Sequence, residues 1–455
     1  MKTIAVVLAA GKGTRMHSDI PKVLHPLMGK PLFQYTLESA QAATGEKPVL
    51  VIGHAAERIQ SAAGDRARFV LQEPQLGTGH ALLQTRQVLE DEADYILLIT
   101  ADMPLLSPAT LQYVITAHQQ AARQRSAPPI TLLFLMDNET RGFGRIERRP
   151  DGSVRAIIEE KQADPGEPPP YELNASVYCF TASWLWEYLP RVPLSPAGEY
   201  YLTDLVSLAT QNGYPVQALP LQDAAEAIGI NNRLHLAEAE AVLRKRINQR
   251  WMLSGVTIID PQTTYIEPDV QIGKDTVVWP NSYLRGSTRV GEACVIGPNS
   301  LIDDTQIGDR CRVLFSMLDK ATLEDDVEVG PFARLRKGAH LARGVHMGNF
   351  GEIKNAYLGP GTKMGHFSYI GDATIGAGVN IGAGTITCNY DGERKHHTEI
   401  ESGAFIGSDT MLVAPVKIGS GASTGAGAVV TKDIPADSLA VGMPARVIRK
   451  KQKRE

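Results

Sequence analysis

The chain has 455 residues, of which 43% are hydrophobic and 21% charged, proportions typical of a folded globular protein with two or three domains. The formal net charge of -4 argues against general nucleic-acid binding, and no apolar run is long enough to span a membrane. Four scattered cysteines without CxxC spacing predict a reducing, cytoplasmic environment rather than a disulfide scaffold or a zinc site.

The first half of the chain has the pattern of an α/β domain. Short apolar runs alternate with longer helical stretches, which predicts parallel strands connected by helices. The expected strands are 4–10, 49–53, 95–100, 130–135 and 177–180, and the expected helices are 32–43, 80–89 and 108–122. The Pro- and Gly-rich stretch 163–170 is expected to be a surface loop.

A glycine-rich string, LAAGKGTRM at residues 8–16, follows the first expected strand. We expect a turn at the N-terminus of a helix, where backbone N–H groups bind phosphate and where Arg15 and Lys22 add positive charge. The string matches neither the Rossmann GxGxxG pattern nor the Walker pattern, and for the glycines alone a purely structural tight turn is an alternative.

Asp102 comes directly after the expected strand 95–100, at the carboxyl end where open α/β sheets bind ligands. From this position we expect Asp102 to face a bound ligand. The alternative is that Asp102 caps a helix before Pro104.

The second half contains small aliphatic residues at every sixth position, with a few shortened steps. A period of six fits no helix, but it fits one short strand plus one turn, often with Gly in the turn. Three such hexads make a triangular coil of roughly 18 residues, and stacked coils bury the aliphatic rows. Residues 387–399 break the period and are predicted to leave the stack as a loop. The first unbroken row is Ile266, Ile272, Val278, Leu284, Val290, Ile296 and Ile302.

Residues 233–251 have helical spacing and no Gly or Pro, so we expect a helix between the two halves. The predicted organisation is an α/β domain over 1–229, a linking helix over 230–251 and a repeat domain over 252–455. The basic stretch 446–454 is expected to be a frayed, solvated end.

Several strings carry a family resemblance that covers nearly the whole chain. LAAGKGTRM with Pro21-Lys22 resembles the signature of sugar-phosphate nucleotidyltransferases, and LGTGHA (76–81), GFGR (142–145) and GINNR (229–233) narrow it to N-acetylglucosamine-1-phosphate uridyltransferases. The repeats resemble the left-handed β-helix of hexapeptide acyltransferases. Within them, MGHFSY (364–369) and GAGTITCNYDG (382–392) resemble the glucosamine-1-phosphate acetyltransferase half of the bifunctional enzyme. The implied fold is a Rossmann-like nucleotidyltransferase domain, a linking helix and a left-handed parallel β-helix.

The resemblance implies a first site that binds UTP, N-acetylglucosamine 1-phosphate and Mg²⁺. Arg15 and Lys22 are the implied catalytic cations, and Asp102 and Asn231 the implied metal ligands. Many relatives have Tyr-Gly-Asp where this chain has Thr100-Ala101-Asp102, and Asn-Thr-Gly where it has 174–176, so the sugar preference is left open. The residues implied to hold nucleotide and sugar are Leu8, Ala9, Ala10, Gly11, Lys22, Gln72, Gly77, Thr78, Gly144, Glu159, Asn174 and Asn231.

The implied second site lies in the repeats. His366 is the implied general base that takes a proton from the amine of glucosamine 1-phosphate, with Glu352 as its orienting partner. Arg336 and Lys354 are implied to hold the sugar phosphate. The residues implied to place the sugar are Tyr369, Asn380 and Asn389, and those implied to line the acetyl-CoA groove are Ala383, Asn389, Tyr390, Ser408 and Ala426.

By this resemblance the protein is a cytoplasmic, bifunctional enzyme. It acetylates glucosamine 1-phosphate with acetyl-CoA, then joins the product to UTP and releases pyrophosphate, which supplies bacterial cell-wall precursors for peptidoglycan and lipopolysaccharide. The flat faces of a triangular coil predict a homotrimer with acetyl-transfer sites between subunits. Two alternatives are a single-activity nucleotidyltransferase with a structural β-helix, and a sugar-nucleotide sensor that binds without turnover.

Overall fold

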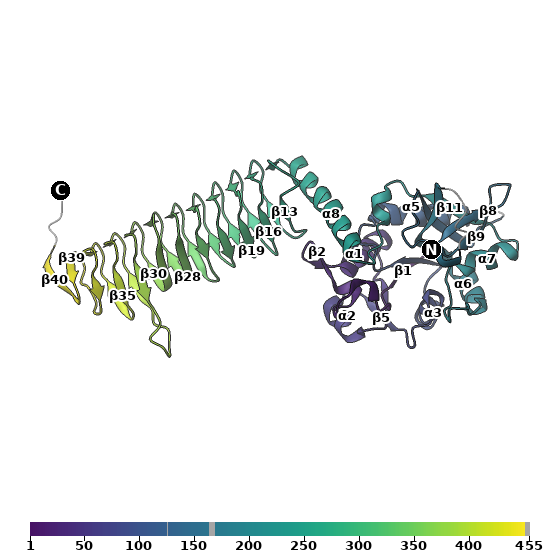
Figure 1. Ribbon diagram of the computed structural model, residues 1–455, viewed down its shortest axis with the longest axis horizontal. Coiled ribbons are helices and arrows are strands. Elements are labelled where there is room, and N and C mark those ends of the chain that lie inside the picture. Colours follow the sequence, from purple (N-terminus) through teal and green to yellow (C-terminus); the bar gives the residue numbers. More distant parts are fainter. Residues whose placement is uncertain (125, 163–168, 451–455) are drawn as a thin grey trace. The chain divides into compact units, whose positions relative to one another are not determined.

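The computed structural model describes residues 1–124, 126–162 and 169–450 (Figure 1). The chain forms two compact units, Met1–Leu243 and Arg244–Glu455. The division falls inside helix α8 (Arg233–Leu253), which is the helix predicted for 233–251. Within the described residues, no helix is both long and apolar enough to cross a membrane.

In the described part of unit 1, nine strands form one sheet, with the main order β11-β7-β10-β6-β1-β4-β5 and the hairpin β8–β9 joined through β10. All five expected strands are present. The prediction that 177–180 runs parallel to its neighbours is wrong, because β10 pairs antiparallel with both β6 and β7. An apolar run indicates burial on both faces but carries no information about strand direction. The bounds are β1 Thr3–Leu8, β4 Val49–Ile52, β5 Arg68–Leu71, β6 Tyr95–Thr100, β7 Ile130–Asp137, β8 Arg145–Arg148, β9 Val154–Ile158, β10 Tyr171–Thr181 and β11 Val216–Pro220.

Two hydrophobic cores show that both faces of this sheet are covered. Val7 and Leu97 point into one core with Phe33 of α1, whereas Leu98, one position along β6, packs in the other core with Leu205 of α7. The helix predicted for 80–89 is divided into two short helices, and the loop predicted for 163–170 lies almost wholly outside the described residues. The helices are α1 Leu32–Thr44, α2 Ala56–Ala63, α3 Thr78–Leu83, α4 Arg86–Leu89, α5 Pro108–Ala121, α6 Ala182–Tyr188 and α7 Asp204–Gln211.

Unit 2 is a parallel β-helix, as the six-residue period predicts (Figure 1). From β12 (Thr257–Ile258) to β38 (Val429–Val430), most strands have two or three residues. Val277 pairs with Val295 and Val295 with Arg312, so one coil takes 17 or 18 residues here. The predicted inward row is buried throughout, and it comprises Ile266, Ile272, Val278, Leu284, Val290, Ile296 and Ile302.

In the middle of the β-helix, two strands are longer than the others and one coil carries an insertion. Strands β28 (Gly351–Leu358) and β30 (Ser368–Ile375) each continue around a corner and pair with one another along most of their length. Further on, Asn380 pairs with Phe405, 25 positions later, which marks an insertion. As predicted, the extra residues leave the stack as a loop between β32 (Ile386–Cys388) and β33 (Thr398–Ile400) (Figure 1).

The basic C-terminal stretch is not a frayed end over its described part. Strand β40 (Ala445–Lys450) pairs antiparallel with β39 (Ser438–Gly442), which itself pairs with the coil before it. Gly442 has a φ of 98° and allows the reversal between the two strands. The expectation of a frayed end was therefore wrong for 446–450, because their backbone pairs with β39, whereas their side chains are exposed to solvent as expected.

Candidate active sites

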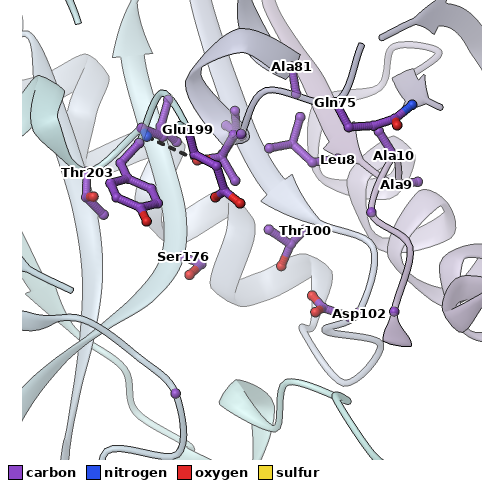
Figure 2. A pocket seen from close by; sticks show the side chains of 18 of the residues that line it. Leu8, Ala9, Ala10, Gln75, Ala81, Thr100, Asp102, Ser176, Glu199 and Thr203 are labelled. Carbon is purple, nitrogen blue, oxygen red and sulfur yellow. Dashed lines mark hydrogen bonds between the residues drawn. The ribbon is translucent and has the colours of Figure 1, made fainter. Parts of the chain in front are cut away.

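The first candidate site is a pocket at the carboxyl ends of β1 and β6 (Figure 2). It is lined by every residue predicted to hold nucleotide or sugar except Asn231, and by Asp102. Asn231 does not line the pocket, but it accepts a hydrogen bond from Lys22, which does. Arg15 donates to the same Asn231 side chain. The sequence strings therefore predicted a set of residues that the fold brings together.

The glycine-rich string is not a turn at the start of an α-helix. After β1 it forms a loop and a three-residue 3-10 helix, Thr14–Met16, and the next α-helix begins only at Leu32. Gly13 has a φ of 64°, and a Cβ there would lie 2.4 Å from Cβ of Lys22. The predicted helix N-terminus was therefore wrong, and this glycine instead lets the backbone approach Lys22.

One cation joins the two predicted metal ligands. Nζ of Lys22 lies 2.6 Å from Oδ2 of Asp102 and 3.2 Å from Oδ1 of Asn231. Nη2 of Arg15 donates to the same oxygen of Asn231 over 2.9 Å. Burial opposes ionisation of Asp102, but the Lys22 ammonium together with hydrogen bonds from Thr100 and the backbone holds the pKa of that carboxyl below its usual value. Two hard oxygens, one of them anionic, thus converge on a single point.

The Gly77–Thr78 segment is held by its own short contacts. The Gln72 side-chain amide donates to the Gly77 carbonyl over 2.9 Å, and Oγ1 of Thr78 accepts the backbone N–H of Leu202. Gly77 has a φ of 96°, and a Cβ there would lie 2.7 Å from the carbonyl oxygen of Tyr200. The close packing against 200–202 fixes this wall of the pocket.

The wall predicted to hold the sugar contains polar residues that the sequence did not indicate. The backbone N–H of Asn174 donates to the Gly144 carbonyl over 2.9 Å. Oε1 of Glu159 accepts a hydrogen bond from the hydroxyl of Thr203, which also lines the pocket. Thr203 and Tyr178 were missed because they lie in stretches with core-like patterns, and only the fold brings them to the pocket.

The second candidate site lies on the β-helix, where cations from two adjacent coils and from the inserted loop come together. Leu335 pairs with Ile353, so Arg336 and Lys354 are neighbours on adjacent coils. The nearby ammonium of Lys395, from the inserted loop, and the charge of Arg336 lower the pKa of Lys354. Like charges held this close favour an anion between them. Lys395 was not predicted, because no repeat position accounts for a loop residue.

Tyr369 and Asn389 converge above a glycine on the same face. A Cβ on Gly371 would lie 2.4 Å from Oη of Tyr369 and 2.8 Å from Nδ2 of Asn389. The Asn389 amide also donates to the carboxylate of Asp372. The absence of a side chain at 371 therefore makes room for both predicted sugar-placing groups, and Gly371 and Asp372 are further residues of the site that sequence reasoning missed.

Three of the five residues predicted for acetyl-CoA, Ala383, Ser408 and Ala426, lie on one corner of the β-helix. Backbone hydrogen bonds join the turns of successive coils there, from Gly384 to Phe367, from Asp409 to Ala383 and from Gly427 to Ser408. These turns place four predicted residues in a single column along the corner. They are His366, Ala383, Ser408 and Ala426.

In the described part of the chain, three predicted residues, Glu352, Asn380 and Tyr390, do not make the contacts that their predicted roles require. Glu352 forms an ion pair with Arg336 over 2.9 Å, and within the described residues no hydrogen bond joins it to His366, which is exposed. Asn380 pairs with Lys363 on a different face from Arg336, across the His366 corner. Tyr390 is exposed in the loop, where its hydroxyl donates to the Gly392 carbonyl. Their proposed roles stay predictions.

Comparison with known families gives the class of the protein. Residues 5–163 match the MobA-like NTP transferase domain, 287–313 the hexapeptide repeat of succinyl-transferase and 397–432 the bacterial transferase hexapeptide. The chain is thus a transferase that combines a nucleotidyltransferase fold with a left-handed β-helix of hexapeptide repeats.

Full-length relatives then identify the family. Proteins named bifunctional protein GlmU from Heliobacterium modesticaldum, Streptococcus agalactiae and Trichlorobacter lovleyi are 46%, 41% and 44% identical to this chain. The matches cover 97–98% of this chain and 95–96% of the relatives. The chain belongs to the GlmU family of bifunctional enzymes, and it combines a uridyltransferase with an acetyltransferase.

Proposed function

We propose that the two activities occupy the two separate sites described above. Unit 2 acetylates glucosamine 1-phosphate with acetyl-CoA, and unit 1 then transfers UMP from UTP to the N-acetylglucosamine 1-phosphate. The convergence of Lys22, Asp102 and Asn231 on one point carries the assignment of uridyl transfer. The cluster of Arg336, Lys354 and Lys395 beside Tyr369 supports the second site as the place where a sugar phosphate binds.

In uridyl transfer, a phosphate oxygen of the sugar attacks the α-phosphorus of UTP, and the bond to the departing pyrophosphate breaks. Both reactants are anions, so Lys22 and Arg15 favour the reaction by screening their repulsion and by stabilising charge in the transition state. No covalent enzyme intermediate is required.

Mg²⁺ is the metal that fits this site. Asp102 supplies a carboxylate oxygen and Asn231 an amide oxygen, both within hydrogen-bonding distance of one nitrogen of Lys22. Hard oxygen ligands, few in number and beside phosphates, suit Mg²⁺, which keeps several waters. When bound there, the ion would neutralise phosphate charge and orient the triphosphate.

In acetyl transfer, the sugar amine attacks the thioester carbonyl carbon, the C–S bond breaks, and the CoA sulfur leaves as the thiol when it receives the proton that the amine has lost. His366 accepts the proton that the amine must lose, and its exposed position on the corner leaves it accessible to substrate. Arg336, Lys354 and Lys395 hold the phosphate of the sugar. The column of Ala383, Ser408 and Ala426 gives the CoA arm a path with small side chains, and Ser408 stabilises the oxyanion.

The acetyl-transfer site is completed by assembly into a homotrimer. Arg336 and Lys354 lie on one face of the β-helix, whereas Asn380 lies on another face across the corner. One subunit therefore cannot close all of these groups around one sugar, but two adjacent subunits of a symmetric oligomer can.

The four cysteines, all in the described part of the chain, are free thiols, which supports a cytoplasmic location.

A single assay tests the proposed function. Purified protein receives glucosamine 1-phosphate, acetyl-CoA, UTP and Mg²⁺, and formation of UDP-N-acetylglucosamine is followed as each input is omitted. Every omission should abolish the product, and ready-made N-acetylglucosamine 1-phosphate should remove the need for both glucosamine 1-phosphate and acetyl-CoA but not for UTP or Mg²⁺. Uridyl transfer without acetyl transfer would instead support the single-activity alternative. Binding without either turnover would support the sensor.

A further inference from the structure

A buried tyrosine lines the uridyl-transfer pocket. Tyr178 lies on β10 opposite Leu98 of β6, and 2% of its surface is exposed. The pairing of β10 with β7 is irregular between Asn174 and Tyr178, and Ser176 has a φ of 55°. In a regular strand, residues four apart would be separated by about 13 Å. The irregularity instead brings Nδ2 of Asn174 to 2.6 Å from Oη of Tyr178.

The hydrogen bonds at this irregularity determine which groups donate. The backbone N–H of Ser176 can only donate, and its partner, 3.2 Å away, is Oδ1 of Asn174. The amide nitrogen of Asn174 therefore faces Tyr178 and donates to the phenol oxygen. Within the described residues, the phenol has no acceptor for its own hydrogen. A buried donor without a partner is costly, so an oxygen of the ligand is the expected acceptor.

The surroundings keep this phenol in its neutral, donating form. Burial raises the pKa of Tyr178, the hydrogen bond from Asn174 opposes this, and the charge of Glu159 adds to it. Ser176 and Thr203 line the same pocket (Figure 2), as do Glu159 and Asn174. The Tyr178 donor therefore belongs to the polar lining that contains the residues predicted to hold the sugar.

The pocket contains a different partner for each part of an N-acetylated sugar phosphate. The cations Arg15 and Lys22 suit the phosphate, and the carboxylate of Glu159 accepts hydrogen bonds from sugar hydroxyls. Tyr178, whose oxygen already accepts from Asn174, has only a donor left. A carbonyl oxygen accepts and does not donate, so it matches that remaining donor better than a hydroxyl does.

We propose that Tyr178 is a specificity-determining residue that donates its phenol hydrogen to the acetamido carbonyl oxygen of N-acetylglucosamine 1-phosphate. This inference rests on the proposed uridyl transfer and states how that site recognises its sugar. It assigns to Tyr178 the discrimination between an acetamido sugar and a plain hexose 1-phosphate.

The test is Tyr178→Phe, which keeps the ring and removes the hydroxyl. The kcat/KM of uridyl transfer with N-acetylglucosamine 1-phosphate should fall by about 10- to 100-fold, the effect of losing one buried hydrogen bond to substrate. With glucose 1-phosphate, which has no acetamido group, the change should stay below about threefold. If that sugar turns over too slowly, its inhibition constant against N-acetylglucosamine 1-phosphate replaces the rate. The KM for UTP should not change.

The matched control is Tyr95→Phe, which removes another buried phenol oxygen at the opposite end of β6, where it contacts the sulfur of Met1. Its uridyl transfer should equal that of the unaltered protein. Acetyl transfer and thermal stability report that each variant is folded. Equal losses of Tyr178→Phe with both sugars, or less than a twofold loss with the acetamido sugar, would overturn the inference. Absence of uridyl transfer in the unaltered protein would instead refute the proposed function.

Discussion

Gly371→Ala is the most direct structural perturbation of the acetyl-transfer site. The new Cβ would lie 2.4 Å from Oη of Tyr369, whereas ordinary van der Waals contact begins near 3.4 Å. The phenol oxygen must therefore move by about 1 Å, and Asn389 must also shift, because its amide nitrogen would lie 2.8 Å away. Since the Tyr369 oxygen is the far end of a side chain, the fold can absorb this movement at the cost of overpacking, about 1–3 kcal/mol.

The expected effect on activity is larger than the effect on the fold. A misplacement of about 1 Å in a positioning group can cost about 10²-fold in rate. We therefore expect kcat/KM for glucosamine 1-phosphate to fall by about 10²-fold in Gly371→Ala. Acetyl transfer is measured by release of CoA thiol, and uridyl transfer of the same sample serves as the internal control. A variant that keeps more than half of its acetyl transfer would show that Tyr369 and Asn389 do not place the sugar.

Three further predictions concern the separate sites. His366→Ala should lower acetyl transfer by about 10² to 10⁴, the usual value of a general base, with uridyl transfer unchanged; near-normal acetyl turnover in a folded variant would rule out the base assignment. Lys395→Met should raise the pKa of Lys354, which its ammonium now lowers. The KM for glucosamine 1-phosphate should rise at alkaline pH when Lys354 loses its proton, and in the variant this rise should occur at a higher pH. A rise at the same pH in both proteins would contradict an effect of Lys395 on Lys354. From the sequence alone, a fragment of residues 1–229 is expected to keep uridyl transfer. The structure changes this expectation, because that fragment lacks Asn231 and the part of α8 that belongs to the core of unit 1, so it should lose uridyl transfer whereas a cut after α8 should preserve it. Equal activity of the two fragments would refute this.

The sequence predicts repetitive and local features of this fold well. The six-residue rows are sufficient for the β-helix, because each coil repeats one rule of an inward aliphatic residue and a turn. Strand direction is different, because it depends on connections that a local pattern does not contain. The strand 177–180 was therefore placed correctly but given the wrong direction.

The candidate sites also contain residues that local sequence patterns predict and residues that only the tertiary structure brings in. Residues within recognisable strings, such as Lys22 and Gly77, were predicted and lie together in the pocket. Tyr178, Gly371 and Lys395 were missed, because their roles depend on a strand irregularity, a crowded neighbour and an inserted loop. These relations exist only between residues that folding brings together.

The central claim is that two independent sites act in sequence on one sugar, and a mixing experiment tests it most directly. Asp102→Asn removes the charge that faces Lys22 and should abolish uridyl transfer alone. His366→Ala should abolish acetyl transfer alone. Neither variant should form UDP-N-acetylglucosamine from glucosamine 1-phosphate, acetyl-CoA, UTP and Mg²⁺, but an equal mixture should form it after a lag while the acetylated intermediate accumulates. Loss of both activities in either variant, or an inactive mixture of folded proteins, would contradict the account.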